Sequence, residues 1–231
     1  YEGGSVNGAK TDGIPRFILF DHTGKMVFNG HPSEANKKLA DVMKNKPDPL
    51  VGAGPYKKLS ALTQKIKERK ELGKILTTLK TKHLVSSDAD EKSEAEQLVD
   101  RLSRYGNRLS QKAEMKKLTE PLNSYNLYRE VATLFKGDEI GDNADKVLKE
   151  LIGDKTFQDN MKADKELADI MPQIDKLKPC GKTCQAFNKG CDACKKKNPS
   201  FDAVLQKAKA LVQKYPSSPA ANKVKELLTV E

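Results

Sequence analysis

The stretch TDGIPRFILFDHTGKMVFNGHP, residues 11–32, decides how the front of this chain folds. Two short runs rich in branched and aromatic residues, 17–20 and 25–30, flank the turn HTG, so the sequence predicts a β-hairpin. The first run is apolar on both faces, which is typical of a strand covered from two sides. Ser33 is a predicted N-cap for an amphipathic helix over residues 33–46. We therefore expect a hairpin and a helix that leave a hydrophobic face uncovered, because two strands alone are marginal in water.

The rest of the chain predicts an all-α domain. The stretch PDPLVGAGP at 47–55 is rich in Pro and Gly, and helical periodicity continues from residue 56 onward, with no strand pattern beyond residue 50. We predict a mostly α protein: a partial α/β domain at 1–46, a linker at 47–55 and a helical domain at 56–231. The expected helices are 56–84, 88–118, 120–136, 141–152, 155–178, 199–214 and 217–229.

Ile14 and Pro15 stand directly before the first predicted strand. A Gly-Ile-Pro followed by strand, turn, strand and helix resembles the C-terminal half of a thioredoxin-like domain of the redoxin, or thiol-disulfide interchange, type. Bacterial members of that family carry a long helical extension. The resemblance implies that Pro15 is cis and that Ile14 and Pro15 form the substrate loop beside a catalytic disulfide. A trans proline that enters an edge strand is the alternative.

The same resemblance bears on activity. Family members have a strand, helix and strand with a Cys-x-x-Cys motif before this proline, and residues 1–46 contain no cysteine. We expect the chain to be non-catalytic as it stands, and to be a fragment or a degenerate form of the domain. Redox turnover, a thiol-disulfide oxidoreductase activity, would then need residues upstream of Tyr1.

All four cysteines fall at 180–194 in the pattern C-x3-C-x6-C-x2-C. If Cys180 and Cys184 lie one turn apart on one helix, and Cys191 and Cys194 on the next, an antiparallel pair of helices brings 180 opposite 194 and 184 opposite 191. Nested disulfides, Cys180–Cys194 and Cys184–Cys191, are then the connectivity that needs least backbone distortion in an exported protein.

Two other hypotheses remain open for this segment. Four thiolates can hold zinc, although a six-residue spacer is shorter than in typical zinc ribbons. The run CDACKKKNPSFDAV also resembles a thioredoxin active-site helix, which implies Cys191 as nucleophile and Cys194 as resolving thiol. The chain is then a redoxin-type protein with a helical domain for protein binding or assembly, a thiol-disulfide oxidoreductase, or a zinc-stabilised interaction module.

Charge and hydropathy restrict the partners. The net charge is +10, but residues 176–197 carry seven Lys against one Asp, and elsewhere the two signs nearly balance, so a nucleic-acid-binding face is not expected. No apolar run is long enough to cross a bilayer. A chain that starts with Tyr1 suggests a processed precursor, and the clustered cysteines suggest a periplasmic or secreted protein with a protein partner. The three histidines are expected at the surface, and the sequence leaves the oligomeric state open.

Overall fold

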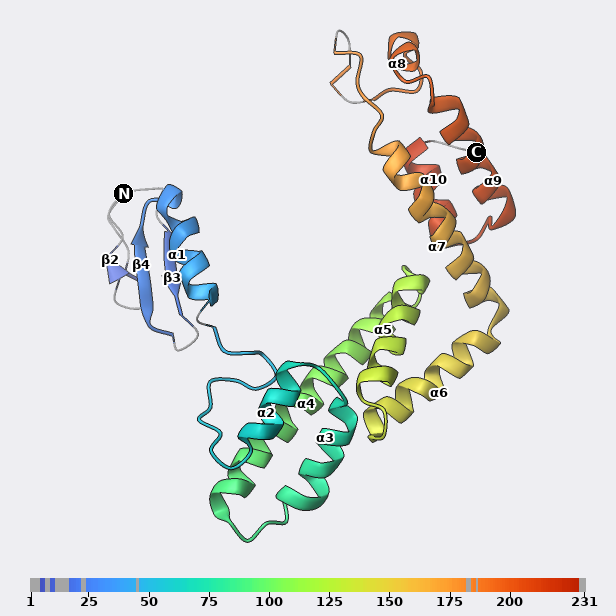
Figure 1. Cartoon of the computed structure of the whole chain (residues 1–231). Coiled ribbons are helices and arrows are strands. Elements are labelled where there is room, and N and C mark those ends of the chain that lie inside the picture. Colours follow the sequence, from blue (N-terminus) through green and yellow to red (C-terminus); the bar gives the residue numbers. More distant parts are fainter. Residues whose placement is uncertain are drawn as a thin grey trace. The chain divides into compact units, whose positions relative to one another are not determined.

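The computed structural model describes residues 5–6, 9–10, 17–21, 24–44, 46–181, 184–185 and 187–228. They form a small antiparallel sheet near the N-terminus followed by helices, which confirms the predicted mostly α fold (Figure 1). The chain divides into two compact units, Tyr1–Glu68 and Arg69–Glu231. This division lies beyond the predicted linker at 47–55.

The first unit contains the predicted hairpin. Strands β3 (Phe17–Phe20) and β4 (Met26–Gly30) pair antiparallel, and helix α1 (Pro32–Lys44) packs against both of them. A second, shorter pair joins β1 (Ser5–Val6) to β2 (Ala9–Lys10). Helix α2 (Ser60–Lys67) completes this unit. The strand, turn, strand and helix order is therefore present as predicted.

Two details of the first unit differ from expectation. Helix α1 begins one residue before the predicted N-cap, and His31 takes that role: its carbonyl accepts the N–H of Glu34 at 3.1 Å. Strand β3 is not the buried, central strand expected: within the described part of the chain it pairs with β4 alone, and its four residues are exposed or half-buried. Phe17 is 50% exposed, and Met43 of α1 is 49% exposed, so the hairpin and helix do leave apolar side chains in solvent.

The regular secondary structure of the second unit consists of helices alone in its described residues. Its elements are α3 (Leu72–Thr78), the π-helix η1 (Leu79–His83), α4 (Ala89–Lys116), α5 (Pro121–Leu134), α6 (Glu139–Gly153), α7 (Lys155–Ile174), α8 (Asp192–Lys197), α9 (Phe201–Lys214) and α10 (Pro219–Leu228). Helix α5 packs against both α4 and α6, as short connections between antiparallel neighbours require (Figure 1). None of the helices in the described ranges is long and apolar enough to span a membrane.

The single helix predicted at 56–84 is wrong. In its place the chain forms α2, α3 and η1, with a break between α2 and α3. At this break Arg69 and Glu71 adopt left-handed backbone angles, with φ of 53° and 51°. Positive φ is unfavourable for residues that carry a side chain. Hydrophobic spacing alone gave no sign of this break, because it does not report backbone angles.

The prediction of surface histidines is also wrong at one position. The His83 side chain is only 12% exposed and is hydrogen-bonded to the carboxylate of Glu91 in the first turn of α4. The hydroxyl of Ser86 donates to the other oxygen of Glu91 at 2.8 Å. Hydrogen bonds from His83 and then Ser86 hold the pKa of Glu91 below its ordinary value. His31 is exposed as predicted, and His22 lies outside the described residues.

The turn between α5 and α6 is enclosed by neighbouring backbone. Phe135 is fully buried there, and a Cβ placed on Gly73 of α3 would lie 2.3 Å from the carbonyl carbon and oxygen of Phe135. A Cβ on Gly141 would lie 2.2 Å from the same oxygen. Thr77 donates its hydroxyl to the Gly137 carbonyl at 2.8 Å. Only glycine permits approaches this close, so α3 and α6 pack directly against the turn.

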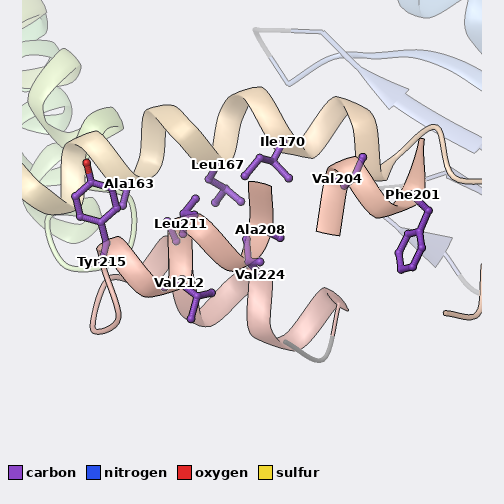
Figure 2. Packing of buried hydrophobic residues seen from close by; sticks show 12 residues of the cluster. Ala163, Leu167, Ile170, Phe201, Val204, Ala208, Leu211, Val212, Tyr215 and Val224 are labelled. Carbon is purple, nitrogen blue, oxygen red and sulfur yellow. The ribbon is translucent and has the colours of Figure 1, made fainter. Parts of the chain in front are cut away.

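A separate core lies at the C-terminal end of the unit, where α7, α9 and α10 meet. Figure 2 shows Leu167 and Ile170 of α7 facing Ala208 and Leu211 of α9, with Val224 of α10 beside them. These apolar side chains are all nearly or fully buried. The segment between α7 and α9 is attached to this core, because Leu177 and Phe187 pack against it.

Candidate metal centre

The four cysteines lie together after α7. Their Sγ atoms are all within 4.8 Å of one another. Cys180 and Cys184 come from the segment that follows α7, Cys191 is the N-cap residue of α8, and Cys194 lies within α8. Cys194 is fully buried and the other three are half-buried. The structure therefore assembles every cysteine that the sequence singled out into one cluster.

The local path of the chain is not the one predicted. Cys180 and Cys184 lie outside the described helices, since α7 ends at Ile174, so the expected antiparallel helix pair is wrong. Two residues explain this. Pro179 has no N–H to continue a helix, and Gly181 has a φ of 81°, a left-handed angle that favours glycine. The cluster forms from a loop that meets a short helix.

A turn at Asn188 directs the chain into α8. The side-chain oxygen of Asn188 accepts the N–H of Gly190 at 2.8 Å, and its carbonyl accepts the N–H of Cys191 at 3.1 Å. The carbonyl of Cys191 then accepts the N–H of Lys195 at 3.0 Å, which begins the helix. These three bonds set the start of α8, with Cys191 at its N-cap and Cys194 one turn later. Both cysteines then lie close to Cys180 and Cys184.

Asn198 joins the loop to the helix, and sequence reasoning missed it. Its side chain accepts the N–H of Lys178 at 2.9 Å and donates to the carbonyl of Lys178 at 2.8 Å and to that of Cys194 at 2.7 Å. Only 6% of this residue is exposed. Because Lys178 lies two residues before Cys180, Asn198 holds the first and last cysteines in register. The Asn-Pro dipeptide after a lysine run was the available signal.

Further contacts attach the loop to the C-terminal core. The rings of Phe187 and Phe201 lie 4.8 Å apart between centroids, and Phe201 is buried in the core of α7, α9 and α10. The ammonium of Lys197 donates to the carbonyl of Pro179 at 2.8 Å. These contacts attach the segment that carries the cysteines to α8 and to the C-terminal core.

The cluster has the dimensions of a site for one zinc ion. Four sulfurs around zinc at about 2.3 Å stand about 3.8 Å from one another in a tetrahedron, which lies within the 4.8 Å limit found here. Soft thiolates favour zinc over hard cations. A four-thiolate site carries a net negative charge with zinc bound, and the seven lysines of 176–197 offset that charge.

The other two hypotheses for these cysteines remain predictions. The structure carries all four as thiols, and two disulfides, Cys180–Cys194 and Cys184–Cys191, would need only two of the six sulfur pairs to be close. For the redox pair, Cys191 is the more accessible thiol and Cys194 the buried one. Over the described part of 175–190 no strand precedes Cys191, unlike the thioredoxin arrangement.

The predicted substrate loop cannot be compared with the structure, because Ile14 and Pro15 lie outside the described residues. No protein-family model, curated protein or solved structure matches this chain.

Proposed function

We propose that residues 180–194 bind one zinc ion through Cys180, Cys184, Cys191 and Cys194, and that the chain is a zinc-stabilised helical module for protein interaction. The observation that carries this proposal is the mutual proximity of all four sulfurs. A single ion needs every sulfur near every other, whereas paired disulfides do not. Zinc here is structural, because four protein ligands leave no open position for a substrate.

The ion supplies cohesion that the segment's side chains lack. Between α7 and α9 the described residues contain one short helix, α8, and few large apolar side chains, among them Leu177 and Phe187. Zinc binding adds directly to folding free energy in such segments. With zinc bound, the loop and α8 become one rigid extension of the core formed by α7, α9 and α10.

Metal analysis of the purified chain tests this proposal. We expect one zinc per chain, which is lost in Cys184→Ser and retained in Ser217→Ala, a surface control outside the cluster. Chelation should increase hydrogen exchange across 176–198 and leave α4, α5 and α6 unchanged. A metal-free chain whose non-reduced mass is lower by four hydrogens would contradict the proposal and support the two disulfides.

The redoxin resemblance is a second proposal, favoured by the order of β3, β4 and α1. In this proposal residues 1–46 are part of a thioredoxin-like domain, non-catalytic in this chain, and the protein is exported and binds a protein partner. A thiol-reductase assay tests it, since turnover by this chain would refute the proposal that it is non-catalytic. Selective alkylation of Cys191 after mild reduction would instead favour an oxidoreductase that uses Cys191 and Cys194.

A further inference from the structure

A second site lies in the helical unit away from the cysteines. A cavity of about 670 Å³ opens between residues 69–74 and residues 133–137, that is, between the start of α3 and the turn after α5. This volume is in the range of small-molecule sites. The four basic side chains that line it are Arg69, Lys70, Lys74 and Lys136, against one carboxylate, Glu71.

The charge of this cavity is not neutralised by its own lining. Glu71 is ion-paired with Lys74. Within the described ranges of the chain, neither Arg69 nor Lys136 has an acidic side chain within salt-bridge distance. The lining therefore carries four basic side chains against one carboxylate, whereas the other residues of 69–175 carry 15 Lys and Arg against 20 Asp and Glu.

Backbone strain is concentrated at the same cavity. Arg69 and Glu71 are the two non-glycine residues with positive φ in the described part of the chain, and both line it. Each such conformation costs about 1–2 kcal/mol. Strain of this kind persists where the surrounding structure enforces it, and it is found at residues that line the cavity.

Two carbonyls of the turn at the opposite wall are occupied by hydrogen-bond donors. The carbonyl of Phe135 accepts the N–H of Asp138 at 3.0 Å, and that of Gly137 accepts the hydroxyl of Thr77 at 2.8 Å. These donors reduce the negative potential expected where α5 ends. The close approach of Gly73 to Phe135 fixes the two walls relative to each other, so the cavity exists before any ligand binds.

From this geometry we infer that the cavity between 69–74 and 133–137 binds a small organic phosphate. The planar guanidinium of Arg69 matches two phosphate oxygens, and Lys136 supplies a second cation from the opposite wall. The volume exceeds what a phosphate ion needs, and Leu134 gives the organic part an apolar contact. This inference is independent of zinc binding.

Calorimetry and amide NMR on the full chain test the inference, with AMP and glucose 6-phosphate as probes and adenosine and glucose as their uncharged counterparts. We expect at least one of the two phosphates to bind, with shifts confined to amides of 69–74 and 133–137. The double variant Arg69→Gln/Lys136→Gln should weaken binding at least about tenfold, because each charge-assisted bond contributes on the order of a tenfold factor.

The double variant Arg101→Gln/Lys112→Gln removes the same charge from exposed positions of α4 and is the matched control. It should bind as the wild type does. Equal loss in both double variants, binding of the uncharged counterparts, inorganic phosphate binding as tightly as the organic phosphates, or no binding by either phosphate would each overturn the inference. Thermal unfolding of both variants separates lost binding from lost folding.

Discussion

Replacing Gly73 by alanine tests the packing of α3 against the turn after α5. The new Cβ would lie 2.3 Å from the carbonyl carbon and oxygen of Phe135 and 2.4 Å from the carbonyl oxygen of Lys136. All three atoms are backbone, so α3 must move away by about 1 Å to restore van der Waals contact. That movement breaks the hydrogen bond from Thr77 to Gly137 and the ion pair of Lys80 with Asp138, both shorter than 2.9 Å.

The size of the effect follows from opposing contributions. Alanine in place of glycine inside a helix stabilises by about 1 kcal/mol. Overpacking costs about 1–3 kcal/mol and the two broken bonds about 1 kcal/mol each. We expect a net loss of about 3 kcal/mol in the free energy of unfolding, which lowers Tm by about 6–12 °C for a unit of this size.

Urea and thermal unfolding followed by circular dichroism measure this change. Gly153→Ala is the matched control, because it lies at the end of α6 and a Cβ there meets no atom within 4 Å. The control should lie within about 0.5 kcal/mol of wild type, as surface substitutions do. If Gly73→Ala were as stable as the control, the close contact between α3 and the turn would not exist.

Three further predictions concern other parts of the helical unit. Asn198→Ala removes three hydrogen bonds, to Lys178 and Cys194. It should lower zinc affinity about 10–100-fold, measured by competition with a chromogenic chelator. Unchanged affinity would show that Asn198 does not position the cysteines. Ser124→Ala removes a fully buried hydroxyl that has no hydrogen-bond partner within the described structure. It should raise the free energy of unfolding, measured by urea titration, by about 1 kcal/mol. A less stable variant would show that the hydroxyl is hydrogen-bonded. Glu91→Gln should destabilise most at neutral pH and progressively less as the pH falls below 4.5, because His83 and Ser86 lower the pKa of Glu91 in the folded state. The stability that Glu91 adds is present above its ordinary pKa of 4.5 and is lost as the pH falls through the folded value. Unfolding curves of wild type and variant that differ equally at neutral and acidic pH would contradict this.

Periodicity predicted most of the elements, because each long helix carries its own start and stop signals. Asp88 is the first residue of the helix predicted over 88–118, and it caps α4 by accepting the N–H groups of Asp90 and Glu91. The hairpin was equally readable from two apolar runs and a glycine turn. Where local chemistry and tertiary packing agreed, the sequence was sufficient.

The failures share a cause, which is contact between separate elements of the chain. Nothing local marks the break at Arg69 and Glu71, since arginine and glutamate are good helix formers. The burial of His83 depends on Glu91 from the next helix. The clustering of the cysteines was foreseen from their spacing, but the part played by Asn198 was not, because its partners at Lys178 and Cys194 are defined only once the loop has folded back.

The contact between α3 and the turn after α5 imposes an order on folding. The Thr77 hydroxyl meets the Gly137 carbonyl across 60 positions of sequence, and the intervening chain contains α4 and α5. Closing so long a loop is entropically costly until those helices pair, and their pairing is local. We therefore expect α4, α5 and α6 to pair first and α3 to dock on them afterwards, so that the α3 contact becomes ordered only once the turn after α5 is in place.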